Sequence, residues 1–150
     1  MQEKKLNHSS KFQDIVLPAA GMGTRLFPET ESKPKILVKV NGKTILEHQL
    51  DVLTQFADLK NIHLILGYKS EILKDFVNNL SLPFNVKFYL NNQFNKTGCS
   101  FSLMKVIPNL KSNFIYLNSD LIISKKSLSA LVYSNKRDII LVRSLKNKKE

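Results

Sequence analysis

Two kinds of segment alternate along the chain. Short, mostly apolar runs are typical of buried strands, and segments in which apolar residues recur every three or four positions are typical of helices. The expected strands are Asp14–Ala20, Asn61–Leu66, Asn85–Leu90, Asn113–Asp120 and Asp138–Ser144, with a short extended piece at Lys35–Val40. The expected helices are Ile45–Ala57, a segment capped by Ser70, Cys99–Ile107 and Ser127–Tyr133. This alternation predicts an α/β fold with a Rossmann-like, mainly parallel sheet flanked by helices.

Length and composition describe one ordinary globular domain. The 150 residues are 43% hydrophobic and 23% charged, and a chain of this length can bury a sizeable core. We expect a polar tail at residues 1–13 and one folded domain at residues 14–150. No apolar run approaches the roughly 18 residues that a membrane span needs, and no apolar core follows the charged N-terminus as in a signal peptide. We therefore expect a cytoplasmic protein that has no membrane partner.

The charge of the chain favours an anionic ligand. There are 23 Lys and Arg residues against 12 Asp and Glu residues, a formal net charge of +11. The lysines are spread along the chain and no basic patch interleaved with aromatic residues occurs, so a dedicated nucleic-acid binder is not expected. The single cysteine, Cys99, excludes an internal disulfide and a cysteine-based metal site.

The expected ligand site lies at the carboxyl ends of the strands. Open parallel sheets bind their ligands there. The segments that follow the expected strands are Gly21–Arg25, Gly67–Lys69, Asn91–Thr97 and Asn118–Asp120. They bring glycines, an arginine, amides and one carboxylate to the same edge, which suits a nucleoside triphosphate and a metal ion.

Two familiar phosphate-binding motifs do not match the glycines. A dinucleotide fingerprint needs a third glycine where this chain has Leu26, and Pro28 interrupts the helix that must follow. A P-loop reading of Gly42-Lys43-Thr44 fails because its first glycine would stand at Leu37. Asn41-Gly42 is better explained as a turn.

The remaining motif is Gly21-Met22-Gly23-Thr24-Arg25, with Pro34-Lys35 ten residues after the arginine. Glycines let backbone N–H groups approach an anion, an arginine grips phosphate in a bidentate fork, and a lysine adds a point charge. Each residue also has a plainer interpretation. Arg25 could be a surface arginine, Lys35 one lysine among many, and Asp120 an acid at a helix N-terminus.

The segment "LPAAGMGTRLFPETESKPKILVKVNGKTILEHQLDVL" resembles the signature of the nucleotidyltransferases that activate sugar phosphates and phosphocholine. "GYKSEIL", "NNQFNKTGCSFSL" and "FIYLNSD" are most similar to the bacterial phosphocholine cytidylyltransferase branch. The similarity covers roughly residues 14–133. It implies that residues 14–150 are the N-terminal portion of a nucleotide-binding family domain, and that this chain lacks the C-terminal part.

The resemblance also implies a role for particular positions. The backbone of Leu17, Ala19, Ala20 and Gly21 would line the base and ribose. The β- and γ-phosphates would be held by Gly21, Gly23, Thr24 and Arg25. Lys35 would contact the α-phosphate and act with Arg25 in catalysis, and Asp120 would bind Mg²⁺. Asn91, Thr97 and Ser102 match the family's loop on the base and substrate side.

The reaction that the resemblance implies is Mg²⁺-dependent transfer of a nucleotide, with CTP favoured, to phosphocholine or a sugar 1-phosphate. Such reactions make precursors of cell-surface polysaccharides or lipids. Residues 121–150 supply no convincing second metal ligand, because Asp138 begins an expected strand and Glu150 is terminal. Two hypotheses therefore stay open, an enzyme or a nucleotide-binding module without turnover, and a homo-oligomer also stays open.

Overall fold

A four-stranded parallel sheet forms the centre of the molecule. The structure is a computed structural model that describes residues 12–110, 113–136 and 138–141. The strand order is β5-β4-β1-β6, with β1 at Phe12–Pro18, β4 at Asn61–Leu66, β5 at Asn85–Leu90 and β6 at Asn113–Tyr116. Ile15 of β1 lies opposite Ile62 of β4 and Ile115 of β6. The expected α/β fold with a parallel sheet is confirmed.

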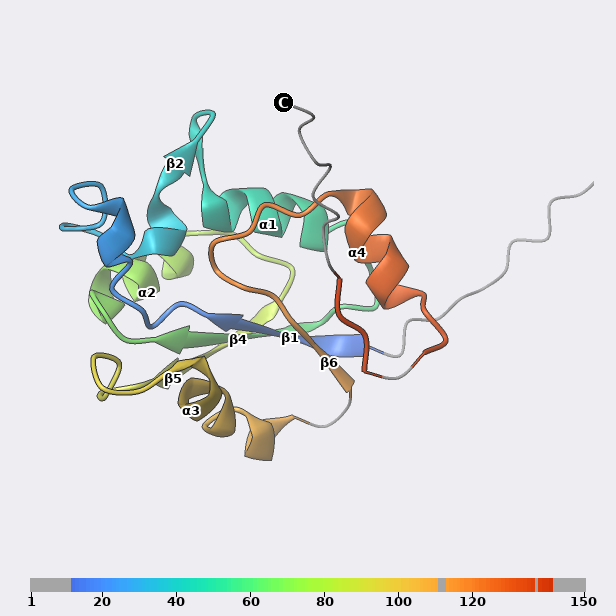
Figure 1. Ribbon diagram of the computed structural model, residues 1–150. Coiled ribbons are helices and arrows are strands. Elements are labelled where there is room, and N and C mark those ends of the chain that lie inside the picture. Colours follow the sequence, from blue (N-terminus) through green and yellow to red (C-terminus); the bar gives the residue numbers. More distant parts are fainter. Residues whose placement is uncertain (1–11, 111–112, 137, 142–150) are drawn as a thin grey trace, which may run out of the picture.

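Helices cover both faces of this sheet (Figure 1). The helices are α1 (Ile45–Leu53), α2 (Ser70–Asn78), α3 (Cys99–Met104) and α4 (Lys125–Val132), with a short 3₁₀ turn at Ile107–Asn109. Apolar residues of α1, α2 and α4 share one core with Ile15, Leu17 and Leu64 of the sheet. Leu103 of α3 packs in a second cluster with Val16 on the opposite face. Burial of this apolar surface is the main force that holds the layers together.

Helix α1 begins where the sequence provides a cap. Thr44 accepts a hydrogen bond from the backbone N–H of Glu47, and the Glu47 carboxylate accepts one from the backbone N–H of Thr44. This reciprocal capping box satisfies two backbone donors that a helix start leaves open. The hydrogen bonds from Thr44 also hold the pKa of Glu47 below its ordinary value.

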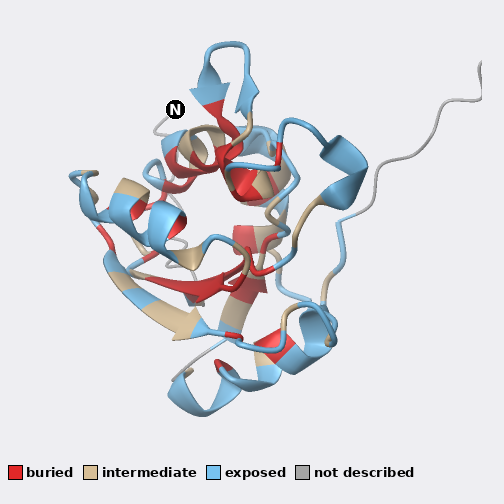
Figure 2. Ribbon diagram, turned by 90° about the vertical axis from the view of Figure 1, so that its left-hand side faces the viewer, coloured by how far each residue is buried: buried red, intermediate tan, exposed pale blue. Residues whose placement is uncertain are grey.

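A hairpin follows the segment that carries Lys35. Residues Lys35–Leu37 form a 3₁₀ turn, and β2 (Lys39–Val40) pairs antiparallel with β3 (Lys43–Thr44). Asn41 and Gly42 connect them with φ angles of 49° and 86°, which confirms the predicted turn. The prediction of an extended piece at Lys35–Val40 is therefore wrong for Lys35–Leu37. Figure 2 shows this hairpin projecting as an exposed loop above the buried strands.

The largest departure from expectation is the strand predicted at Asp138–Ser144. Residues 138–141 form no strand, and the side chain of Ile140 is 84% exposed; residues 142–144 lie outside the described residues. An apolar run becomes a strand only where a neighbouring strand pairs with it. No described strand pairs with β6 on the side away from β1.

Other differences concern the ends of elements. Strand β1 begins at Phe12, inside the expected tail, whose residues 1–11 are outside the described part. Lys69, in the left-handed region at φ 52°, is the N-cap of α2, so the prediction that Ser70 caps this helix is wrong. Helix α1 ends at Leu53, four residues earlier than expected. Cys99, at the start of α3, is exposed.

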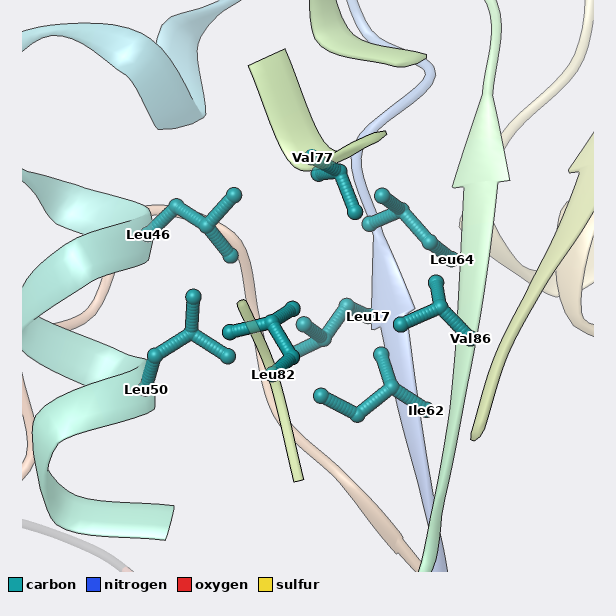
Figure 3. Close-up of a pocket in the computed structure, with 8 residues that line it drawn as sticks. All are labelled: Leu17, Leu46, Leu50, Ile62, Leu64, Val77, Leu82 and Val86. Atoms are coloured by element: carbon teal, nitrogen blue, oxygen red, sulfur yellow. The ribbon is translucent and has the colours of Figure 1, made fainter. Parts of the chain in front are cut away.

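The core beneath α1 contains a small apolar cavity. Figure 3 shows Leu46 and Leu50 of α1 facing the sheet across it. Its lining consists of Leu17, Leu46, Leu50, Ile62, Leu64, Val77, Leu82 and Val86. No polar side chain lines it, so it is a packing defect and not a candidate site. Separately, none of the helices that the structure describes is long and apolar enough to span a bilayer.

Candidate functional site

The segments predicted to carry function follow the carboxyl ends of four parallel, adjacent strands. Gly21–Arg25 follows β1, Gly67–Lys69 follows β4, Asn91–Thr97 follows β5 and Asn118–Asp120 follows β6. Because all four strands run in the same direction, these segments meet at one edge of the sheet. The structure thus brings the predicted site residues to one rim.

The glycine segment turns sharply after β1. Gly23 has a φ of 66° and caps the 3₁₀ turn Thr24–Leu26. A Cβ at Gly23 would lie 3.1 Å from Cβ of Lys35 and 3.3 Å from Cγ2 of Thr30, so both conformation and space favour glycine. A Cβ at Gly21 would have no neighbour within 4 Å. The backbone at Gly21 is therefore open to an anion.

The nucleotide-binding residues predicted around this turn differ in exposure. Thr24 and Arg25 are exposed, and Arg25 forms no ion pair with any carboxylate that the structure describes. The side chains of Leu17, Ala19 and Ala20 are buried in the core. Their side chains therefore do not face a ligand, and the backbone role expected for these three residues stays a prediction.

Lys35 and Asp120, the predicted phosphate and metal residues, are in direct contact. Nζ of Lys35 donates a hydrogen bond of 2.6 Å to Oδ2 of Asp120. Their side chains are 30% and 46% exposed, so the pair lies at the surface of the rim and is accessible to a ligand. Strand β6 lies beside β1 in the sheet. The loop that follows β6, which contains Asp120, therefore lies beside the segment that follows β1.

The donor set at the rim fits Mg²⁺ only in combination with a phosphate ligand. Asp120 offers an accessible carboxylate, which is a hard oxygen donor. Among the described residues, no group of three or more His, Cys, Asp or Glu side chains could hold a metal by itself. Mg²⁺ in nucleotide sites commonly keeps several waters and uses one or two carboxylates together with substrate phosphates. A single exposed carboxylate fits that arrangement.

Asn91 and Thr97 belong to a hydrogen-bonded cluster after β5. The Asn91 amide donates to Oγ1 of Thr97 at 3.0 Å and to Oγ of Ser102 at 2.9 Å. Its carbonyl oxygen accepts from the backbone N–H of Gln93 at 3.0 Å. The Asn91 side chain is buried and all its polar atoms are used, so it shapes this loop from within.

Three residues support the rim in ways that the sequence analysis did not predict, although Tyr68 lies in the predicted rim segment Gly67–Lys69. Thr30 is fully buried, and its hydroxyl donates to the carbonyl of Gly23 at 2.9 Å. The Tyr68 hydroxyl donates to the carbonyl of Glu31 at 2.7 Å. Gln49 is fully buried and contacts the loop of Asp120. Only Gln49 had a visible signal, because it is a polar residue on the apolar face of its helix.

The chain belongs to the nucleotidyl transferase family, whose sequence model matches residues 14–144. The fold and the arrangement of the rim agree with this assignment.

Several known proteins are similar to this chain. The bifunctional protein GlmU of Methanococcus maripaludis is 31% identical over 123 residues, 81% of this chain. The CTP:phosphoglutamine cytidylyltransferase of Campylobacter jejuni is 25% identical over 135 residues, 86% of this chain. Among solved structures, CTP:phosphocholine cytidylyltransferase from Streptococcus pneumoniae (LicC) matches 73% of this chain with 32% identity and a TM-score of 0.62. The chain spans only 28%, 52% and 45% of these proteins, respectively.

Proposed function

We propose that this chain binds a nucleoside triphosphate with Mg²⁺ and transfers its nucleotide to a phosphorylated small molecule, with release of pyrophosphate. The observation that carries the proposal is the pair of Lys35 and Asp120, a cation and a carboxylate that meet at the rim beside the open backbone of Gly21. One charge suits a phosphate and the other suits a metal ion.

In this proposal each residue at the rim has its own task. The backbone at Gly21 and Gly23, together with Thr24 and Arg25, holds the β- and γ-phosphates. Lys35 neutralises charge at the α-phosphate as the acceptor approaches in line with the leaving pyrophosphate. Asp120 holds Mg²⁺, which when bound adds positive charge at the phosphates. Arg25 suits its task because it is exposed and forms no ion pair with a described carboxylate.

The base and ribose are assigned to the other side of the rim. The backbone of Leu17, Ala19 and Ala20 lines them, and the loop shaped by Asn91 and Thr97 closes that side. CTP is the favoured nucleotide because two of the similar proteins are named as cytidylyltransferases. The acceptor is phosphocholine or a sugar 1-phosphate. A cytoplasmic location goes with this proposal, because CTP is a cytoplasmic metabolite.

A second candidate function is nucleotide binding without turnover. It is favoured by the single carboxylate beside Lys35, because no group of three or more His, Cys, Asp or Glu side chains among the described residues could hold a metal by itself. In this case Arg25 and Lys35 hold the nucleotide as proposed, and no acceptor reacts with it.

Pyrophosphate release distinguishes the two functions. CTP, UTP, dTTP, GTP and ATP are each supplied with phosphocholine or with glucose 1-phosphate, using the longest open reading frame that contains this chain. The proposal expects release that depends on an acceptor and is fastest with CTP. If CTP binds and no pair of substrates releases pyrophosphate, the binding module is the correct function.

A further inference from the structure

Gln49 is a buried polar side chain inside an otherwise apolar helix face. It lies on α1 between Leu46, Leu50 and Leu53, which belong to the main core, and it is 0% exposed. Burying an amide away from water is unfavourable unless hydrogen bonds replace those it made to water. The contacts of Gln49 therefore show what this amide does in the core.

Both donors of the Gln49 amide bind the loop that carries Asp120. Nε2 donates to the carbonyl of Asn118 and to the carbonyl of Leu121, each at 2.8 Å. These two carbonyls lie on either side of Asp120 in the chain. Only the NH₂ end of a glutamine can face two carbonyl oxygens, so the orientation of this amide follows from its partners.

Core stability alone does not explain this residue. Oε1 of Gln49 is buried and has no hydrogen-bond partner in the described part of the structure. An unpaired buried oxygen opposes folding, and a methionine or leucine at this position would avoid it. The feature that only an amide provides here is the pair of hydrogen bonds to the loop of Asp120.

The loop of Asp120 has few other anchors. Asn118, Asp120, Leu121 and Ile122 are all exposed. Within the described residues, the other hydrogen bonds that anchor this loop are those from Leu117 to Val16, from Leu121 to Asn118, and from Lys35 to Asp120. An exposed loop with few anchors opens easily, whereas a metal ligand must be held within about 0.5 Å of its productive position.

We infer that Gln49 is a positioning residue that holds the Asn118–Leu121 turn, and thereby Asp120, in the arrangement that binds the metal of the nucleotide. The inference rests on the proposed function, because it concerns the same metal ligand. Gln49 does not touch the ligand itself. Its effect must therefore appear in how strongly the metal increases the affinity for the nucleotide.

The experiment measures the dissociation constant of CTP by calorimetry, once with Mg²⁺ and once with EDTA. The dissociation constant in EDTA divided by the constant with Mg²⁺ reports how much the metal strengthens binding. We expect Gln49→Met to reduce this ratio by about tenfold, which is the lower end of the effect of removing partners that orient metal ligands. Gln55→Met is the control, because Gln55 is an exposed amide in the turn after α1 that donates to the backbone carbonyl of Asp51 and has no recorded contact with the loop of Asp120.

Asp120→Asn distinguishes failure of this inference from failure of the proposed function. If Asp120→Asn lowers the ratio and Gln49→Met does not, the function stands and the positioning role is wrong. If the wild type itself shows a ratio of one, the metal-dependent function and the inference both fail. If Gln49 acts through Asp120, Gln49→Met has no further effect on the ratio in the Asp120→Asn background; an undiminished effect there overturns the inference.

A measurement on the wild-type protein covers the case in which Gln49→Met does not fold. Linkage is reciprocal, so metal that binds the arrangement held by Gln49 must also strengthen the hydrogen bonds of Gln49. Hydrogen exchange of the Gln49 side-chain amide, followed by NMR, should be slower with CTP and Mg²⁺ than with CTP and EDTA. Equal exchange rates in the two conditions would contradict the positioning role.

Discussion

The ammonium group of Lys35 lies 2.6 Å from the carboxylate of Asp120, although 85 positions separate the two residues in the chain. Each charge is neutralised by the other in the ligand-free protein. A metal at Asp120 or a phosphate at Lys35 must therefore compete with this ion pair. The pair connects the two halves of the proposed site and makes their binding interdependent.

This competition predicts that removal of the lysine improves metal binding. Lys35→Met should bind Mn²⁺ alone up to about fivefold more tightly than wild type, because a partly exposed ion pair contributes at most about 1 kcal/mol. Asp120→Asn should bind Mn²⁺ more weakly. Electron paramagnetic resonance of free Mn²⁺ measures both effects, with Lys33→Met as the control, since Lys33 pairs with Glu29 instead. Weaker binding by Lys35→Met would show that the lysine does not compete.

Arg25 is predicted to bind phosphate through its fork and not only through its charge. Arg25→Lys keeps the charge and should bind CTP at least about tenfold more weakly, because a charge-assisted hydrogen bond contributes roughly 1.5–3 kcal/mol. Arg25→Met removes both properties and should be weaker still. Both variants should melt like wild type, since Arg25 is exposed. If Arg25→Lys binds CTP as tightly as wild type, Arg25 makes no bidentate contact with the phosphates.

Gly67 is predicted to be required for folding where β4 ends. A Cβ at this position would lie 2.6 Å from the carbonyl oxygen of Ala20 and 2.8 Å from Cβ of Phe94. Gly67→Ala should lower the free energy of unfolding by about 1–3 kcal/mol, the usual effect of overpacking. Urea denaturation measures this, and Gly21→Ala is the control, because a Cβ at Gly21 meets nothing within 4 Å. Equal stabilities of the two variants would contradict the close approach of Ala20 and Phe94 to Gly67.

The apolar cavity beneath α1 predicts a stabilising substitution. Val86 lines this cavity, so Val86→Ile places one more methylene in empty space. The variant should gain about 0.8 kcal/mol in the free energy of unfolding. Val132→Ile makes the same change at a buried position, 2% exposed, that does not line the cavity, and should be neutral or destabilising. A loss of stability in the Val86 variant would mean that the cavity cannot accept a methyl group.

The sheet could be predicted from the sequence because its strands are continuous or alternating apolar runs, such as Asn61–Leu66. The rim could be predicted too, since all parallel strands end at the same edge. The run at Asp138–Ser144 shows the limit of this reasoning. An apolar run in the sequence does not show whether a partner strand is available. Residues 138–141 have no partner strand among the described strands.

The contacts within the site were less predictable. The resemblance to a family suggested Lys35 and Asp120, but nothing in the sequence showed that they touch, because their contact depends on β1 and β6 being neighbours. The role of Thr30 could not be predicted, because it lies in a polar stretch and its contribution is a single hydrogen bond to the carbonyl of Gly23. Gln49 was detectable as a polar residue on an apolar face, although its partners were not.

The most direct test of the central claim is the melting temperature of this chain with and without millimolar CTP and Mg²⁺. A ligand that binds only the folded state stabilises it by about 2.7 kcal/mol at a hundred times its dissociation constant. We expect CTP with Mg²⁺ to raise the melting temperature, and CTP with EDTA to raise it less. A larger shift with UTP or dTTP than with CTP would show that the preferred nucleotide is a uridine or thymidine nucleotide and not CTP. If no nucleoside triphosphate shifts the melting temperature, the rim of Gly21–Arg25, Lys35 and Asp120 is not a nucleotide site.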